Sequence, residues 1–344
     1  MIHIYNTNEA ALWDEIVKSF AQYDVYYLSD YVRAFVIHGD GEPKLLYYEG
    51  DGLRAIYVYM KRKTTLEGYY DSVTPYGYGG VLFEGDTSEE NKEAFWREYL
   101  KVMEQEHIVD NFVRYHPVLK NAEPMKSISN VIDLGKTIAL DLSSPDVIWE
   151  NIISKNRNMI RKAKKNGIEI RHGKDLDLFD DFRKIYNATM EKDNAEEYYF
   201  FGEKFYESIH NDLYDNCEMF YAVLNGEIIA MSIMLFANNQ MHYHLSGSLI
   251  KYRNLAPSNL LLYKAAVWGC EQGYKTFHLG GGVGSGEDNL YKFKAAFNRN
   301  SNYQFSIGKE VFDHEKYDEL VELRSLKDSS FDRESKYFPL YRTK

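Results

Sequence analysis

Hydrophobic and polar positions along the chain form a series of patterns that recurs in the same order in each half. In the first half, two helical patterns precede two alternating runs, Lys44–Tyr48 and Leu53–Met60, which flank Gly50-Asp51-Gly52. Such a glycine-containing turn between alternating runs predicts a β-hairpin. An aromatic strand pattern, a long helical pattern and a final strand pattern follow, at Tyr69–Val73, Ser88–His107 and Phe112–Tyr115.

The second half repeats this order. Two helical patterns precede the alternating runs Glu218–Leu224 and Glu227–Phe236, which are separated by Asn225-Gly226. Asn-Gly favours the positive φ angles of a two-residue hairpin turn, so it predicts a second hairpin. A strand, a helix that Ser258 is expected to cap, and another strand follow, at Met241–Ser246, Ser258–Gln272 and Thr276–Leu279. The repeated order indicates an internal duplication.

A length of 344 residues suits two domains better than one. We therefore expect a mixed α/β (α+β) fold of two tandem domains, each a mixed, mostly antiparallel sheet flanked by helices. The first domain is placed at 1–145, the second at 146–308, and a charged helical tail, able to pack back on the first domain, at 309–344. A continuous basic helix at Ile148–Asn166 is expected to join the halves.

The net charge of −11 argues against a general nucleic-acid binder, because phosphate contacts require a basic surface. However, the charged residues of Ser154–Lys174 are basic except for Glu169. One basic segment in an acidic protein indicates one localised anionic partner. A solvated amphipathic helix explains the same segment equally well.

The two cysteines, Cys217 and Cys270, are too few for a disulfide framework, which favours a reducing cytoplasm. No secretory signal pattern opens the chain. The uncharged run Ile228–Ile250 is long enough to span a membrane, but Asn238-Asn239-Gln240 divides it into two strand-length pieces. We therefore expect a cytoplasmic protein with no transmembrane segment, in which peripheral contact with a membrane stays open.

Several motifs resemble the FemABX aminoacyltransferases. They are, in chain order, Pro75–Gly80, Ser154–Ala163, Tyr243–Ser248, Arg253–Pro257, Leu279–Gly282 and Leu290–Phe297. The resemblance implies two acetyltransferase-type (GNAT) domains and the transfer of an amino acid from aminoacyl-tRNA to an amine of a peptidoglycan precursor. Relatives with the same domain use acyl-CoA, so acyl transfer to an amino sugar or another cell-envelope amine is the alternative. A non-catalytic binding module on the same fold is a third hypothesis.

The candidate catalytic residues are Lys294, Phe293 and Tyr291. Phe293-Lys294 resembles the Phe-Lys pair at the active site of the family, and a cation there stabilises the oxyanion that forms during acyl transfer. Tyr291 lies one helical turn before Lys294 and is a candidate proton donor to a leaving sulfur, although simple packing explains it as well. Asp288 is first a candidate helix cap and second a candidate general base.

Donor binding is assigned to the turn before a helix start, the glycine run and the basic segment. The residues are Arg253, Ser258, Tyr243, Gly281, Gly282, Lys155, Arg157 and Arg161. Helix N-termini bind anions, but Pro257 removes an N–H donor from this one. This modestly favours a donor other than coenzyme A. The run Gly280–Gly286 lacks the spacing of nucleotide-binding glycine motifs and is interpreted as a turn that lets substrate approach.

The acceptor is assigned to an aromatic and basic group in the first half, comprising Tyr76, Tyr78, Arg114 and His116. No metal is expected, because His242 and His244 share a strand face without a third ligand. No tightly bound cofactor is expected either, and the co-substrate is aminoacyl-tRNA or acyl-CoA. The expected partners are a small-molecule or lipid-linked cell-wall precursor and the acceptor end of tRNA, but not DNA.

Overall fold

Two hairpins organise the strands of the computed structural model, which describes residues 1–343. They join β2 (Glu42–Gly50) to β3 (Leu53–Lys63) and β9 (Cys217–Leu224) to β10 (Glu227–Ala237). Each turn has two successive residues with φ between 49° and 82°, Asp51-Gly52 and Asn225-Gly226. Two positive φ angles give a turn whose twist matches that of the flanking strands. Both predicted hairpins are confirmed.

The chain forms two compact units. The first comprises Met1–Leu134 and the described segment from Phe305 onward, and the second comprises Gly135–Gln304. The boundaries fall within β7 (Val131–Asp141) and β13 (Tyr303–Val311). The division at residues 145 and 308 into acceptor-binding and catalytic domains stays a prediction.

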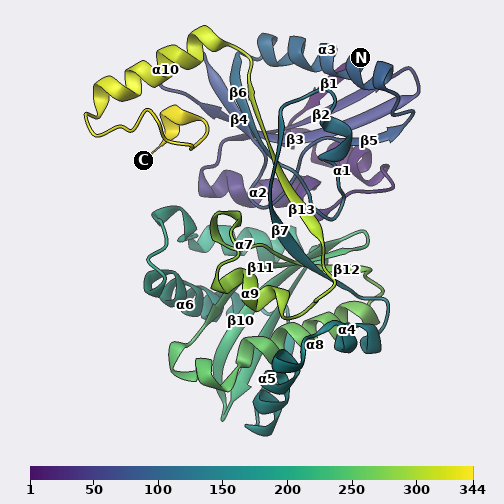
Figure 1. Cartoon of the computed structure of the whole chain (residues 1–344), viewed down its shortest axis with the longest axis vertical. Coiled ribbons are helices and arrows are strands. Elements are labelled where there is room, and N and C mark those ends of the chain that lie inside the picture. Colours follow the sequence, from purple (N-terminus) through teal and green to yellow (C-terminus); the bar gives the residue numbers. More distant parts are fainter. Residues whose placement is uncertain (344) are drawn as a thin grey trace. The chain divides into compact units, whose positions relative to one another are not determined.

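The first unit is a mixed sheet flanked by helices (Figure 1). Its strand order is β1-β2-β3-β4-β6-β13, with β5 paired to β3. Only β4 and β6 are parallel among these pairs. The remaining strands are β1 (Ile2–Tyr5), β4 (Tyr70–Val73), β5 (Leu82–Gly85) and β6 (Ile108–Arg114). The helices are α1 (Ala10–Lys18), α2 (Ser29–His38), α3 (Glu89–Gln105) and α10 (His314–Lys327).

The second unit repeats this plan in the order β8-β9-β10-β11-β12-β7. Here β11 and β12 form the single parallel pair. The strands not yet given are β8 (Glu169–Gly173), β11 (Gln240–Ser248) and β12 (Thr276–Gly280). The helices are α4 (Pro145–Asn151), α5 (Ser154–Lys165), α6 (Leu176–Lys192), α7 (Glu203–Asp212), α8 (Pro257–Glu271) and α9 (Asn289–Ala295). The predicted mixed α/β fold is confirmed.

Each unit's sheet is completed by a strand that directly follows the elements of the other unit in the chain. β7 follows β6 in the chain, but its residues Ile138–Asp141 pair with β12. β13 follows α9, but its residues Ile307–Val311 pair with β6. Neither contiguous half of the sequence therefore carries a complete sheet.

The joining helix differs from the prediction of one continuous helix at Ile148–Asn166. It is two helices, α4 and α5, separated at Ile152-Ile153, whose ψ angles of 129° and 151° are extended. The backbone N–H of Ile153 donates to the carbonyl of Ala296 at 3.1 Å. This long-range hydrogen bond replaces a helical one and stabilises the break.

The C-terminal segment packs within the first unit through a buried acid pair. The Tyr341 hydroxyl lies 2.5 Å from Asp110 Oδ2 and 3.0 Å from Asp71 Oδ2. Arg62 and Arg342 both form ion pairs with Asp71. Both carboxylates are fully buried. Burial, and then the negative charge of Asp71, raises the pKa of Asp110 to about 7.

We expect Asp110→Asn to flatten the pH dependence of stability. The folded-state pKa of about 7 lies above the ordinary value, so the wild-type protein loses stability as pH rises from about 4 to about 7. For one proton, the free energy of unfolding changes by at most about 1.4 kcal/mol per pH unit. Urea unfolding at pH 4.5 and pH 8 measures this difference. Asp318→Asn, at an exposed acid on α10, is the control. An unchanged slope in Asp110→Asn would contradict the assignment.

Candidate functional site

Lys294 is a buried lysine near the end of α9, in the second unit. Its side chain is only 9% exposed, and its Nζ donates to the carbonyl of Gly281 at 2.8 Å. Tyr291 and Phe293, on the same short helix, pack partly against the hydrophobic core of this unit. The structure therefore brings the three candidate catalytic residues together on α9 and directs the Lys294 ammonium at the end of β12.

Burial lowers the pKa of Lys294 to about 8, and the charge of Asp288 partly opposes this shift. A fall from 10.5 to about 8 corresponds to roughly 3 kcal/mol of unfavourable free energy for holding the charged form inside the fold. Strongly perturbed pKa values cluster at functional sites, so this shift makes Lys294 a functional-site candidate. At pH 7, the side chain remains mostly an ammonium.

The loop that receives Lys294 begins where β12 ends. Gly280 has a φ of 78°, which favours glycine. At Gly282, an added Cβ would lie 2.3 Å from the Gly286 carbonyl oxygen and 2.4 Å from Asp288 Oδ1. Glycine is therefore needed at position 282 so that the backbone can approach the start of α9. The interpretation of this run as a turn agrees with the structure.

The two parallel strands beside this loop pair over a short distance. The β11–β12 register runs from Gln240 with Thr276 to His242 with His278, whereas β11 continues to Ser248. A register shift in the β10–β11 pairing places His244 at a β-bulge. Bulges bend a strand and interrupt pairing, which makes room for a ligand at a strand end.

In the first unit, backbone hydrogen bonds continue beyond the end of the parallel strand pair, β4 and β6. After the β4–β6 ladder, Gly79 N–H donates to the Arg114 carbonyl at 2.8 Å, and His116 N–H donates to the Gly79 carbonyl at 3.1 Å. Gly79 and Tyr115 form a parallel bridge. The two units therefore share a topology, but they differ where parallel strands could admit a ligand.

The start of α8 lies after β11 and carries Ser258, one of the predicted donor-binding residues. The cap position is Ala256 in a left-handed conformation, with φ 60° and no side-chain cap. The prediction that Ser258 caps this helix is wrong. Pro257 takes the first helical position, where its fixed φ fits and its missing N–H costs nothing, and Ser258 lies within the first turn. Arg253 is exposed on the preceding 3₁₀ turn, and Tyr243 packs partly against the core.

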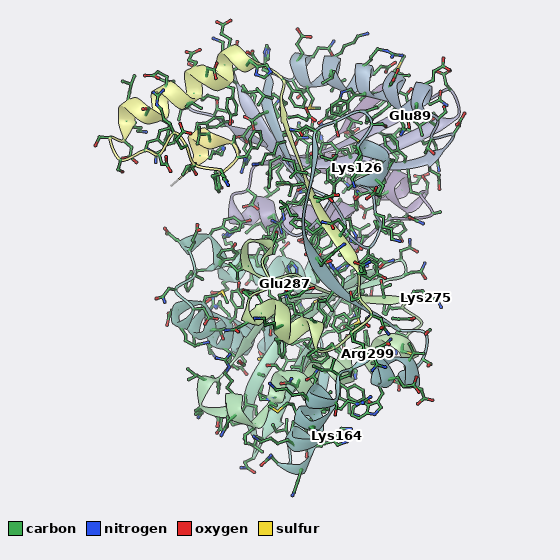
Figure 2. The ribbon with its side chains drawn as sticks, in the orientation of Figure 1. Glu89, Lys126, Lys164, Lys275, Glu287 and Arg299 are labelled. Atoms are coloured by element: carbon green, nitrogen blue, oxygen red, sulfur yellow. The ribbon has the colours of Figure 1, made fainter. Side chains whose placement is uncertain are left out.

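The basic helix α5 packs beside the start of α8 (Figure 1). Asn259 donates to Asn156 Oδ1 at 2.6 Å, and Lys162 donates to the Asn254 carbonyl at 2.6 Å. Lys164, labelled in Figure 2, is exposed on this helix. The structure thus places the basic helix α5 beside the turn and helix start that were predicted to bind an anion, and Lys162 is bonded to that turn.

The three predicted donor-binding residues of α5 differ in their surroundings. Lys155 is exposed. Arg157 donates to the Trp149 carbonyl at 3.3 Å, and the Arg161 guanidinium lies 5.2 Å from the centroid of the Trp149 ring. The two arginines therefore already contact α4, while Lys155 is the exposed member of the three.

The four predicted acceptor residues lie together in the first unit. The Tyr78 ring contacts His116 with centroids 5.8 Å apart, and the Arg114 guanidinium lies 5.8 Å from the Tyr78 centroid. Arg114 Nε also donates to the Gly77 carbonyl at 2.9 Å. Tyr76 belongs to the same loop and stacks on Phe35 at 5.4 Å. Tyr76, Tyr78 and Arg114 are half-buried, whereas His116 is fully buried.

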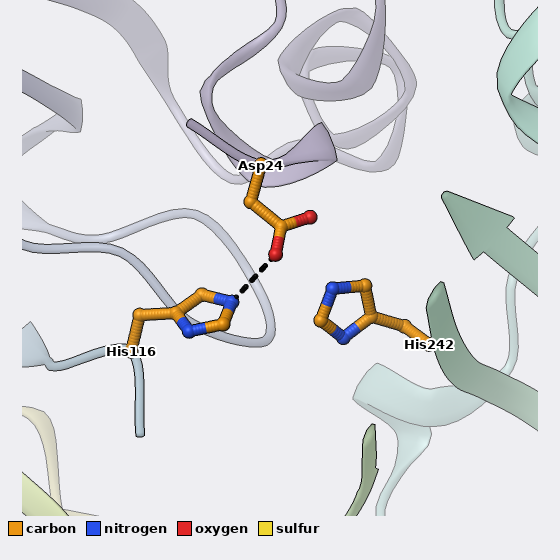
Figure 3. Close-up of side chains that lie close together, drawn as sticks. All are labelled: Asp24, His116 and His242. Atoms are coloured by element: carbon orange, nitrogen blue, oxygen red, sulfur yellow. Dashed lines mark ion pairs between the residues drawn. The ribbon is translucent and has the colours of Figure 1, made fainter. Parts of the chain in front are cut away.

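Asp24 lies beside His116 in a buried position (Figure 3). His116 Nε2 lies 2.8 Å from Asp24 Oδ2, and neither side chain is exposed to solvent. The backbone N–H of Leu119 donates to His116 Nδ1 at 3.2 Å. Nδ1 is therefore the acceptor nitrogen, which leaves the ring proton on Nε2, the nitrogen nearer to Asp24.

Two features of these sites were missed in the sequence. Asp24 lies far from His116 in the chain and stands in a stretch that carries no motif, so no local signal connected them. His278 is buried opposite His242, with ring centroids 5.7 Å apart. The strand pattern predicted β12, but it could not predict that His278 pairs with His242. The register of two parallel strands depends on the long connection between them.

The comparisons with known proteins agree with this architecture. Residues 154–294 match the family model of the acetyltransferase (GNAT) domain. The crystal structure of FemX has a TM-score of 0.69 at 14% identity and covers 92% of this chain and 99% of that chain. The C-terminal domain of a putative lysylphosphatidylglycerol synthetase from Agrobacterium fabrum has a TM-score of 0.57 at 14% identity, with 88% and 91% covered. A tandem GNAT protein from the clavulanic acid biosynthesis pathway has a TM-score of 0.51 at 8% identity, with 91% and 99% covered.

No curated protein sequence matches the chain. The predicted resemblance to FemABX-like and GNAT-superfamily proteins is confirmed for the fold, and the matched acetyltransferase domain ends at Lys294. Among the described residues, no helix has both the length and the apolar character needed to cross a bilayer.

We expect Gly282→Ala to destabilise the second unit. Its methyl group would collide with the Gly286 carbonyl and with Asp288, and overpacking of this kind costs about 1–3 kcal/mol. Gly284→Asn is the matched control. Gly284 has a φ of 60°, which asparagine tolerates, and no atom lies within 4 Å of the position of an added Cβ. Urea unfolding compares the two variants, and equal free energies of unfolding would contradict the packing argument.

Proposed function

We propose that this protein is an amide-forming N-acyltransferase whose reaction takes place in the second unit. The observation that carries the proposal is the buried ammonium of Lys294, held at the end of β12 within the matched acetyltransferase domain. An ammonium in a site with little water stabilises negative charge far more strongly than one in bulk solvent.

The proposed reaction transfers an acyl group to an amine. The amine nitrogen attacks the carbonyl carbon of the donor, and the carbonyl oxygen becomes an oxyanion. Lys294 donates a hydrogen bond to this oxyanion, which exists only around the transition state, so the interaction raises kcat. The C–N bond then remains, the bond to the leaving oxygen or sulfur breaks, and the amine loses a proton while the leaving group gains one.

Aminoacyl-tRNA is our first proposal for the donor. The basic side chains of α5 beside the start of α8 suit the phosphates of an acceptor end, and Lys155 is exposed there. The fold is similar to that of FemX. The proposed acceptor is the amine of a peptidoglycan precursor, and Tyr76, Tyr78, Arg114 and His116 are the proposed acceptor-binding residues. The reaction would belong to cell-wall synthesis on the cytoplasmic side of the membrane.

Acyl-CoA is the second proposal for the donor. It is favoured by the match of residues 154–294 to an acetyltransferase domain. Among the described residues no side chain caps the start of α8, so the first-turn N–H groups at Ser258 and Asn259 suit a phosphate group. Pro257 removes one donor from that site, which keeps this proposal second.

The direct test is incubation of the purified protein with aminoacyl-tRNAs and a UDP-linked muropeptide, followed by mass spectrometry of the muropeptide. A mass increase by one amino acid supports the first proposal. Acylation of amino sugars with acetyl-CoA, and no product with charged tRNA, supports the second. No amide with either donor would overturn the proposed reaction.

Lys294→Met should abolish most activity without unfolding the protein. Loss of one oxyanion donor costs about 10²–10³ in kcat. Methionine has a similar length and carries no charge, so the free energy of unfolding at pH 7 should stay equal or rise. Lys292→Met, at an exposed lysine on the same helix, is the control and should retain activity. If Lys294→Met left both the rate and the biological effect intact, a binding role without catalysis would replace the proposal.

The pH dependence of kcat should show an alkaline limb near pH 8. The pKa of Lys294 is about 8, so the ammonium form is present below that pH and falls about tenfold per unit above it. Lys294→Arg keeps its charge at all these pH values and should lose the limb. A rate that rises through pH 8 in the wild type but not in Lys294→Arg would instead assign Lys294 as a base, because deprotonation of the acceptor amine affects both proteins alike.

A further inference from the structure

Asp288 connects the start of α9 with the loop that precedes it. Its Oδ1 accepts a hydrogen bond from the backbone N–H of Tyr291 at 2.8 Å, which caps the helix. Its Oδ2 accepts one from the backbone N–H of Val283 at 3.2 Å. One carboxylate therefore holds two backbone segments, whereas a simple helix cap holds only one.

The loop fits closely around this carboxylate. An added Cβ at Gly282 would lie 2.4 Å from Asp288 Oδ1, so the backbone itself contacts the side chain. Gly281 lies close to the Lys136 carbonyl oxygen of β7, 3.3 Å from the position of an added Cβ. The loop is thus held between a strand on one side and Asp288 on the other.

This arrangement links Asp288 to Lys294 in two ways. The loop presents the Gly281 carbonyl, which accepts the hydrogen bond from Lys294 Nζ at 2.8 Å. Asp288 is also the one charged side chain with a resolved effect on Lys294, and its negative charge raises the pKa of that lysine against the effect of burial. Hydrogen bonds from the backbone, first of all from Tyr291, lower the pKa of Asp288, so it is ionised at neutral pH.

We propose that Asp288 is a positioning residue that holds the 281–286 loop in place and keeps the buried Lys294 ammonium charged and directed at the reacting carbonyl. The proposal rests on the proposed function in one respect, because it takes Lys294 as the oxyanion donor. If Asp288 were only a helix cap, any residue that caps as well would replace it.

The test uses Asp288→Asn and Asp288→Ser. Both residues are good helix caps, so each can accept the hydrogen bond from Tyr291, but neither carries the charge. Asparagine also presents an amide N–H where Val283 needs an acceptor. Glu287→Gln is the control, because Glu287 is the exposed neighbour of Asp288 and has the same charge (Figure 2).

The first readout needs no substrate. Competitive labelling of lysines with acetic anhydride across a pH series, measured by mass spectrometry, yields the titration midpoint of Lys294, with exposed Lys292 as the internal reference. We expect a midpoint near pH 8 in the wild type and in Glu287→Gln. In both Asp288 variants it should fall by roughly one pH unit, because a nearby opposite charge is lost. Equal midpoints in all four proteins would overturn the proposal.

The second readout is activity with the donor and acceptor that form an amide in the incubation described under the proposed function. Both Asp288 variants should lose at least about tenfold in kcat with little change in KM, and their alkaline limb should move to lower pH. A kcat equal to that of the wild type would also overturn the proposal. The two failures are distinguishable, since a shifted midpoint without any amide product would remove the proposed function but leave the coupling of Asp288 to Lys294 intact.

Discussion

The desolvation of one ammonium group is the constraint on which the rest of the site depends. Lys294 loses most of its hydration in the second unit, and a single carbonyl oxygen, that of Gly281, accepts its hydrogen bond among the described residues. A buried charge with so little compensation is unfavourable unless the surrounding structure imposes it. The glycine loop, the capped helix and the end of β12 together impose it here.

Duplication of the fold did not lead to duplication of the site. Both units have one parallel strand pair in a largely antiparallel sheet, which is where backbone groups can become available to a ligand. In the first unit, the loop around Gly79 continues the backbone pairing beyond the strands. In the second, the pairing of β11 with β12 stops at His242. This difference in strand pairing is why the proposed chemistry is placed in the second unit.

Buried charges in the first unit serve structure and orientation. Asp24 fixes the tautomer of His116, and the pair Asp71 and Asp110 receives Tyr341 from the C-terminal segment. These carboxylates are paired or hydrogen-bonded, as buried charges must be. Lys294 differs from them because it has no ion-pair partner within 4.0 Å in the described part of the chain. A buried, perturbed charge of this kind is a candidate for a functional role.

Local signals in the sequence determined much of this protein. Asn225-Gly226 and the alternating runs around it specify a hairpin without help from distant residues, because turn geometry and side-chain alternation are local properties. The repeated order of elements then indicated the duplicated α/β fold. The position of Lys294 came from a resemblance of motifs, since a lysine next to Lys292 on a short helix has no pattern of its own.

Only the tertiary structure decided the features that depend on long-range contacts. The break between α4 and α5 follows from a hydrogen bond to Ala296, and the burial of Lys294 follows from the loop that packs over it. The exchange of β7 and β13 likewise joins residues that are far apart in the chain. Helix and turn preferences act over a few neighbouring residues. Desolvation and strand pairing depend on which distant segments come into contact, and no local sequence pattern predicts those contacts.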